Sequence, residues 1–115
     1  MMRNDEKDIV WLGDSLAVLQ VFPKSVRIDL GSDLGSDLRR LQIGELPVDS
    51  KPIKTVGPGV RELRARDRNN QYRTMYVIRM RTKVVVLHSF IKKSRTTPKA
   101  DIDTARERLR AFDRK

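Results

Sequence analysis

Three consecutive segments in the second half of the chain have the pattern of β-strands. They cover residues 60–66, 72–79 and 83–90, and the second and third are rich in β-branched and aromatic residues. The connections between them, DRNNQ and MRT, are short enough for hairpins. Because strands joined by a hairpin run antiparallel, these segments predict an antiparallel meander. We expect residues 83–90, which are apolar on both faces, to be buried on both sides and central in the sheet.

Alternation along two of these segments divides their side chains between two faces. In residues 72–79 the tyrosines fall on one face, and Arg73, Met75 and Val77 fall on the other. In residues 83–90 Val85 and Leu87 share one face. The opposite face is predicted to carry Val84, Val86, His88 and Phe90.

Helical patterns lie on both sides of the predicted meander. A short strand at residues 8–12 is followed by a helix over 15–22, which must end before Pro23. The last helix is predicted to begin with Thr97 as its N-cap and Pro98 in its first position. Its apolar stripe consists of Ile102, Ala105, Leu109 and Phe112. We expect a solvated basic face made of Arg106, Arg108, Arg110 and Arg114.

The sequence LGSDLGSDL at residues 30–38 contains a four-residue unit written twice. It could be a flexible linker, but the apolar side chains around it recur at helical spacing. These side chains are Val26, Leu30, Leu34, Leu38 and Leu41. We therefore predict a second helix from about residues 23–25 to Gly44. The repeat is then a duplicated four-residue stretch, which is tolerated because it preserves the apolar stripe. Residues 45–59, rich in Pro, Gly and Lys, predict an irregular connection.

The positive charge of the chain is concentrated in its second half. Residues 51–115 contain nineteen Lys and Arg against six Asp and Glu, whereas residues 1–50 contain six against nine. Such a field attracts polyanions, and in a chain without an amphipathic membrane anchor this favours nucleic acid. The 115 residues contain no cysteine and no long apolar run, so we expect one domain over residues 1–115, in the cytoplasm and not in a membrane.

Several kinds of catalytic site are excluded by residue type. His88 is the single histidine of the sequence, so a pair of histidines cannot act as acid and base, and there is no phosphate-binding loop or nucleophile elbow. A lone histidine in an apolar strand is more often structural. What remains is a high density of Arg and Lys, which can hold a phosphate, stabilise developing charge and exchange protons where neighbours lower their pKa.

An ordered set of motifs gives this chain a recognisable family resemblance. GVRELRARDRNNQYRTMYVI and VVVLHSFIKKSRTTPKADIDTARERL, together with WLGDS and LQIGELPVDSKPIK, cover most of the chain. In this set the chain resembles the RelE/HigB superfamily of type II toxins, in particular its phage-derived HigB-like branch. The corresponding helix of that branch has room for one GSDL unit.

The resemblance implies an α+β fold in which an N-terminal helical hairpin packs on a twisted antiparallel β-sheet with a C-terminal helix. It also implies a metal-independent endoribonuclease without cofactors, an mRNA interferase that inhibits translation at the ribosome. The implied partners are the ribosome, mRNA and a cognate antitoxin, a small helix-turn-helix protein of the same operon. The superfamily also contains ParE-like gyrase poisons without nuclease activity. That function, or an attenuated RNA-binding remnant, is the alternative.

The resemblance assigns roles to particular cations of this sequence. Arg64 of ELR and Arg73 of YR match positions suited to the scissile phosphate and the transition-state charge. Lys92 and Lys93 match a basic strand end that could supply a proton donor or a phosphate contact. We expect the side chains of Arg73 and Lys93 to lie outside the core. Contacts to RNA are assigned to Lys54, Arg61, His88 and Arg95. The motifs do not identify the general acid and base.

The repeat gives a first prediction. Four residues add about 6 Å to a helix and rotate the residues beyond them by only about 40°, so deleting Gly31–Leu34 keeps the apolar stripe in register. Removing one glycine should also stabilise the helix by about 1 kcal/mol. We expect a folded, more stable chain with altered toxicity, antitoxin binding or self-association, measured by thermal unfolding, growth and binding assays. A sharp loss of stability would show that the second copy belongs to the core.

Overall fold

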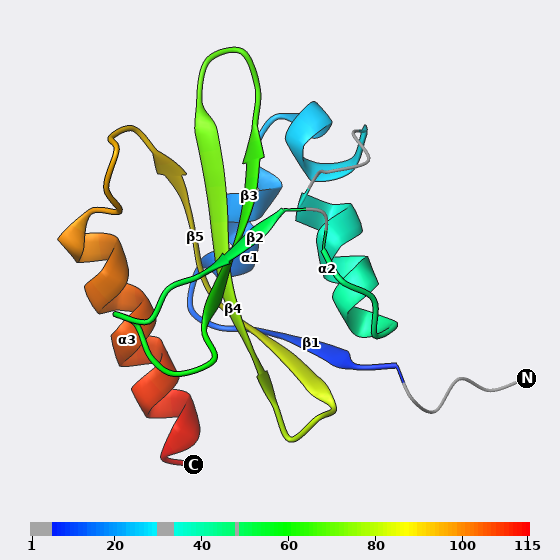
Figure 1. Cartoon of the computed structure of the whole chain (residues 1–115), viewed down its shortest axis with the longest axis vertical. Helices are drawn as coiled ribbons and strands as arrows, with labels where there is room; N and C mark the ends of the chain where they lie inside the picture. The colour runs from blue at the N-terminus through cyan, green and yellow to red at the C-terminus, as the bar shows by residue number, and fades with distance from the viewer. Residues whose placement is uncertain (1–5, 30–33, 48) are drawn as a thin grey trace, which may run out of the picture.

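A computed structural model describes residues 6–29, 34–47 and 49–115, and in this part of the chain five strands form one open sheet (Figure 1). The order of the strands across the sheet is β1-β5-β4-β3-β2. Their bounds are Asp8–Trp11 for β1, Ser50–Pro52 for β2, Arg61–Arg66 for β3, Gln71–Arg79 for β4 and Lys83–Lys92 for β5.

The predicted meander is confirmed, because β3 pairs with β4 and β4 with β5 in antiparallel register. One expectation about the sheet is wrong. The sheet is not wholly antiparallel, because β1 runs parallel to β5. The N-terminal helices permit this pairing, since they carry the chain across one face of the sheet before it returns. As predicted, β5 is buried on both faces and lies inside the sheet, between β1 and β4.

The connection predicted to be irregular contains the short edge strand β2. It pairs antiparallel with β3 over three residues, from Ser50 opposite Leu63 to Pro52 opposite Arg61. Proline lacks a backbone donor and is tolerated at a sheet edge, so Pro52 fits this position. The edge strand places the following residues 53–60 against the face of the sheet that α3 covers.

Four helical segments accompany the sheet in the described residues. They are α1 Ser15–Gln20, the π-helical turn η1 Ser25–Asp29, α2 Leu34–Gln42 and α3 Lys99–Asp113. As predicted, α1 ends before Pro23, and Gly44 ends α2 with a φ of 83°. The N–H groups of Gly44 and Glu45 bond to the carbonyls of Leu41 and Arg40, which is a Schellman C-cap. Residues 30–33 are outside the described residues, so the continuity of a second helix and the helical hairpin stay predictions.

The start of α3 lies one residue later than predicted. Pro98, with φ −58° and ψ 144°, is in the cap position, and its carbonyl accepts bonds from the N–H groups of Asp101 and Ile102. The extended ψ keeps Pro98 out of the first helical turn, so Thr97 is not the N-cap. The predicted apolar stripe is confirmed, because Ala105 and Leu109 are buried and Ile102 and Phe112 pack against them.

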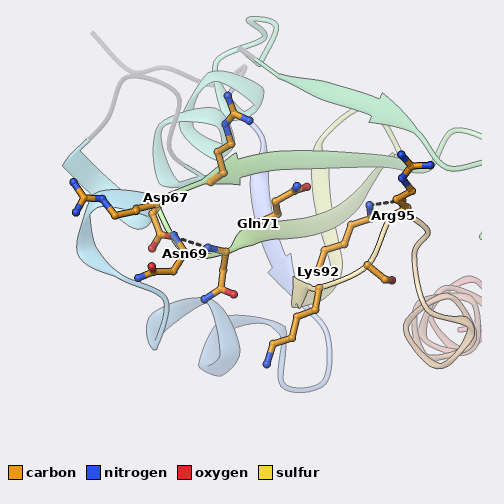
Figure 2. Close-up of a pocket in the computed structure, with 10 residues that line it drawn as sticks. Asp67, Asn69, Gln71, Lys92 and Arg95 are labelled. Atoms are coloured by element: carbon orange, nitrogen blue, oxygen red, sulfur yellow. Dashed lines mark hydrogen bonds between the residues drawn. The ribbon is translucent and has the colours of Figure 1, made fainter.

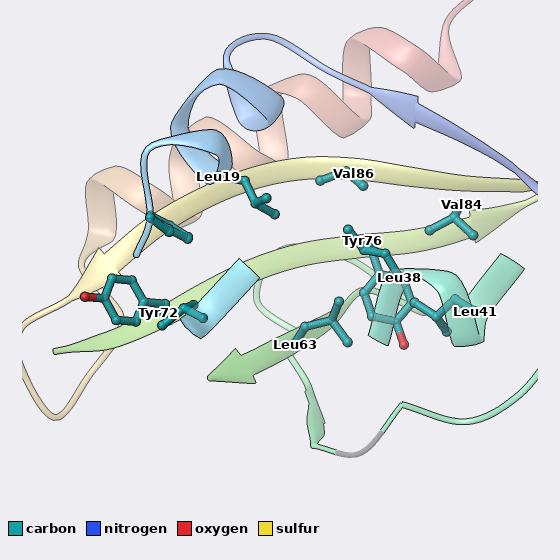
Figure 3. Packing of buried hydrophobic residues seen from close by; sticks show 10 residues of the cluster. Leu19, Leu38, Leu41, Leu63, Tyr72, Tyr76, Val84 and Val86 are labelled. Atoms are coloured by element: carbon teal, nitrogen blue, oxygen red, sulfur yellow. The ribbon is translucent and has the colours of Figure 1, made fainter. Parts of the chain in front are cut away.

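Two hydrophobic clusters cover opposite faces of the sheet. On one face α1, the turn after it, η1 and α2 contribute Leu19, Phe22, Val26, Leu38 and Leu41. Figure 3 labels Leu19, Leu38 and Leu41 of this set. These pack on side chains of the sheet, namely Leu63, Tyr72, Tyr76, Val84 and Val86. On the other face α3 and residues 53–60 pack on Met75, Val77, Val85, Leu87 and Phe90. The strands β4 and β5 are therefore covered from both sides, as a sheet between helices requires.

A β-bulge at Leu87 changes which side chains of β5 share a face. Val86 pairs with Tyr76 and His88 pairs with Met75, so Leu87 is the extra residue. Beyond the bulge the alternation is inverted, and Phe90 joins Val85 on the α3 face. The prediction that His88 and Phe90 lie opposite Val85 and Leu87 is therefore wrong.

One arginine of α3 fastens the helix to the start of α1. Arg108 donates to the Asp14 carboxylate at 2.8 Å and to the Leu87 carbonyl at 3.0 Å. Its guanidinium covers Gly13, whose φ is 54°, and a Cβ built at Gly13 would lie 2.4 Å from the Arg108 Cζ. Arg108 is therefore not part of a freely solvated basic face. None of the helices in the described residues is long and apolar enough to span a bilayer.

The β4–β5 turn gives a second prediction. Met80 and Arg81 have φ values of 55° and 60°, which side chains other than glycine rarely adopt, and Thr82 N–H closes the turn on the Arg79 carbonyl. Replacing Met80 by Asn and Arg81 by Gly should stabilise the protein by about 1 kcal/mol or more, because these residues adopt this turn readily. Urea unfolding measures the change. A control with Ala at both positions retains the strain, and equal stabilisation by that control would contradict the explanation.

Candidate active site

A pocket of about 520 Å³ opens on the α3 face of the sheet, between the β2–β3 edge and the start of α3. We call it the basic pocket. Its charged lining side chains in the described residues are six cations and one carboxylate. They are Lys51, Lys54, Glu62, Arg64, Arg73, Lys92 and Arg95. The wall on the side of α3 is formed by Thr96, Thr97 and Ile102. The pocket therefore combines side chains from every strand between β2 and β5.

A second hollow of about 870 Å³ adjoins the basic pocket and is lined by the β3–β4 hairpin (Figure 2). We call it the hairpin pocket. It comprises residues 66–71 of the hairpin and residues 92–95 at the end of β5. Lys92 and Arg95 line both pockets, so the two form one basic surface. Asp67 shapes the hairpin by accepting bonds from the N–H groups of Asn69 and Asn70 at 2.9 and 2.8 Å. These bonds hold the pKa of Asp67 below its usual value.

The β3–β4 register places two arginines directly opposite each other in the basic pocket. Arg64 pairs with Arg73, and like charges in this position repel. Each has a carboxylate partner: Arg64 Nε lies 3.2 Å from Asp49 Oδ1, and Arg73 Nε lies 3.2 Å from Glu62 Oε1. The pair of Arg64 is half-exposed, whereas the side chains of Arg73 and Glu62 are only 8% and 3% exposed.

Arg73 is buried in the lining of the basic pocket and contacts three neighbouring groups. Besides its contact with Glu62, it donates to the Gln71 side-chain oxygen at 2.6 Å and to the Tyr72 carbonyl at 3.2 Å. The expectation that Arg73 lies outside the core is therefore wrong. The register turns its side chain into the α3 face, where the strand is covered. A guanidinium fixed in this way needs no reorganisation to stabilise an anion in the pocket.

Burial shifts the pKa of three groups in the basic pocket. Loss of hydration raises the pKa of Glu62 and lowers that of Arg73, and it outweighs their mutual attraction. Burial, followed by the positive charge of Arg73, lowers the pKa of Lys92. The Lys92 ammonium donates to the Arg95 carbonyl at 2.7 Å. A lysine with a lowered pKa is a stronger acid, so Lys92 is suited to donate a proton.

A known protein family matches most of this chain. A family model described as Phage derived protein Gp49-like (DUF891) matches residues 17–110, from α1 to most of α3. The chain belongs to this Gp49-like family. The family is a RelE/HigB-type toxin-like family associated with toxin–antitoxin systems, which implies an antitoxin partner. No curated protein matches the chain significantly.

In this Gp49-like protein, five of the eight residues assigned to the site from the sequence line the basic pocket. These are Lys54, Arg64, Arg73, Lys92 and Arg95. Lys93 lies next to them in the hairpin pocket. Among the residues that the structure describes, no group of three or more His, Cys, Asp or Glu side chains is placed to hold a metal ion. The charged side chains in the described lining of the basic pocket are those of Lys, Arg and one Glu.

Arg61 and His88 line neither of these two pockets. Arg61 pairs with Tyr76 on the face that carries the N-terminal helices, and its guanidinium donates to Ser50 Oγ at 3.2 and 3.1 Å. His88 lies beneath α3, where its Nε2 is 2.7 Å from Asp101 Oδ1 and its ring stacks on Phe90 at 5.3 Å. In this arrangement His88 secures the first turn of α3, which forms one wall of the basic pocket.

Two charged residues that line the basic pocket were not assigned from the sequence. Glu62 is in the middle of the VREL stretch and has the pattern of a surface charge, although alternation in a strand places it on the same face as Arg64. Lys51 belongs to β2, in a connection that was predicted to be irregular, so no pattern indicated its direction. Glu62 is the more important omission because it is the partner of Arg73.

The buried ion pair gives a third prediction. Glu62→Ala leaves the charge of Arg73 buried without a partner and should destabilise the protein by about 3–5 kcal/mol. Arg64→Ala, in the exposed pair, should cost about 1 kcal/mol or less. Replacing both Glu62 and Arg73 by Met should leave the stability near that of the wild type or increase it, because neither charge is then buried. Urea unfolding compares the three variants, and equal losses for Glu62→Ala and Arg64→Ala would contradict the analysis.

Proposed function

We propose that this Gp49-like protein is the toxin of a type II toxin–antitoxin system and that it cleaves mRNA on the ribosome. The observation that supports this most is the basic pocket itself, whose six cations include a lysine of lowered pKa. A site of this composition is suited to a phosphodiester. Phosphodiester cleavage builds up negative charge on the phosphate and on the leaving oxygen, and both need cationic neighbours.

Each cation of the basic pocket has a role in this proposal. Arg73, which is fixed by three partners, stabilises the charge that develops on the phosphate. Arg64 is more exposed and contacts a phosphate oxygen directly. Lys92 donates a proton to the leaving oxygen. Lys54 and Arg95 lie at the same pocket and contact the phosphates on either side of the scissile bond.

The hairpin pocket extends this surface for the RNA strand. It adds Arg66, Arg68 and Lys93 to the cations that the two pockets share. Phosphates of a single strand are separated by one nucleotide, so a series of cations longer than one pocket suits several consecutive nucleotides. Binding through such contacts releases counterions, and we therefore expect it to weaken as the salt concentration rises.

The proton donor gives a fourth prediction. Replacing Lys92 by Met should reduce ribosome-dependent cleavage of mRNA by about 100-fold or more, because one preorganised group at the developing charge is lost. The measurement uses purified ribosomes, a defined mRNA and gel analysis of the fragments. Lys24→Met removes the same charge and side-chain length from an exposed site outside both pockets, and it should cleave like the wild type.

Two results would contradict the proposed function, and a third would contradict the role of Lys92. If the protein inhibits or poisons DNA gyrase and expression stops DNA synthesis before protein synthesis in pulse labelling, the protein is a gyrase poison. If it binds RNA in a salt-dependent way but cleaves none with or without ribosomes, it is an attenuated remnant. If Lys92→Met cleaves like the Lys24→Met control, the proton donor lies elsewhere.

A further inference from the structure

We propose that Glu62 is a positioning residue of the basic pocket, which holds the guanidinium of Arg73 and places a negative charge among the cations of the lining, Lys92 included. This inference rests on the function proposed for the same pocket. It concerns a residue that touches other side chains and not the reacting atoms, so its effect on the reaction passes through Arg73 and Lys92.

The geometry of Glu62 is unusual for a group that merely stabilises the fold. It lies on β3, its Oε1 atom is 3.2 Å from Arg73 Nε on β4, and its side chain is 3% exposed. Its second oxygen, Oε2, is buried and has no hydrogen-bond donor among the residues that the structure describes. A buried carboxylate that is only half satisfied costs stability, and well-packed apolar side chains would serve the fold as well or better.

The surroundings of Glu62 explain why a carboxylate is useful there. Arg73 on β4, Lys92 on β5, Lys51 on β2 and Arg64 on β3 all act electrostatically on Glu62. Lys54 and Arg95 complete the cations of the pocket, whereas α3 contributes Ile102 and no charge to its described lining. Glu62 is the one carboxylate in the described lining of the basic pocket, and together with Asp49, the partner of Arg64, it offsets cations that would otherwise repel one another.

The negative charge of Glu62 has a definite effect on Lys92. Burial and the charge of Arg73 both lower the pKa of Lys92, and the carboxylate of Glu62 opposes them. Neutralising Glu62 should therefore lower this pKa further, so that Lys92 loses its proton at a lower pH. Lys92 cannot donate a proton once it is deprotonated. The alkaline limb of the pH–rate profile should therefore move to lower pH as well.

Glu62→Gln is the variant that tests this, because it removes the charge and keeps the shape. The titration of Lys92 is followed by NMR on the ¹³Cε resonance of the folded full-length chain, which requires no activity. We expect a lower pKa for Lys92 in Glu62→Gln. Ribosome-dependent cleavage should fall by about 100-fold at alkaline pH, because displacing a catalytic group such as Arg73 reduces the rate by about this factor. Asp103→Asn removes one charge from α3 outside both pockets and should change neither readout.

The outcomes separate this inference from the proposed function. If Lys92 titrates at the same pH in Glu62→Gln and in the wild type, Glu62 does not control it and the inference is overturned. If the pKa of Lys92 falls but neither protein cleaves RNA, the inference is supported and the nuclease function is not. If Glu62→Gln fails to fold, the wild type decides: an inflection of the Lys92 resonance at the pH where Glu62 titrates supports the coupling, and its absence overturns it.

Discussion

The ion pair between Glu62 and Arg73 is the constraint around which the basic pocket is built. It joins neighbouring strands inside a covered face of the sheet, where an unpaired charge would be costly. A slip of one residue between β3 and β4 would turn Glu62 and Arg64 toward the apolar cluster of the N-terminal helices. The pair therefore favours one register, and that register places Arg64 opposite Arg73. Two arginines of neighbouring strands thereby line the same pocket, which is the arrangement that the proposed chemistry uses.

The two faces of the sheet differ in polarity and in their contribution to the candidate site. The face under α1, η1 and α2 is an apolar layer (Figure 3), whereas the α3 face combines an apolar cluster with the polar pocket at the start of the helix. This division requires α3 to be held firmly near its first turn. The contacts of His88 with Asp101 and of Arg108 with Asp14 provide that attachment, so residues outside the pocket determine the position of its wall.

The sequence predicted the parts of this structure that have a local signal. Strands β3, β4 and β5 follow from alternation and short turns, and Gly44 marks the end of α2. The parallel pairing of β1 with β5 has no local signal, because it depends on how the helices fill the face between them. The bulge at Leu87 lies in a run where every residue is apolar, so composition could not reveal it. For the site, the motifs identified the cations but not Glu62, whose importance arises from burial that only the paired strands create.

The parallel pairing of β1 with β5 has a consequence for the order in which the protein folds. The hairpins of β3, β4 and β5 are local and can form early, but Ser15 bonds to Val86 across 71 residues and Asp14 to Arg108 across 94. During synthesis β1 therefore leaves the ribosome before β5 and stays unpaired until β5 has been made. The wall of the basic pocket formed by Thr96, Thr97 and Ile102 is synthesised after all five strands. A growing chain that has already formed its hairpins therefore still lacks a complete pocket.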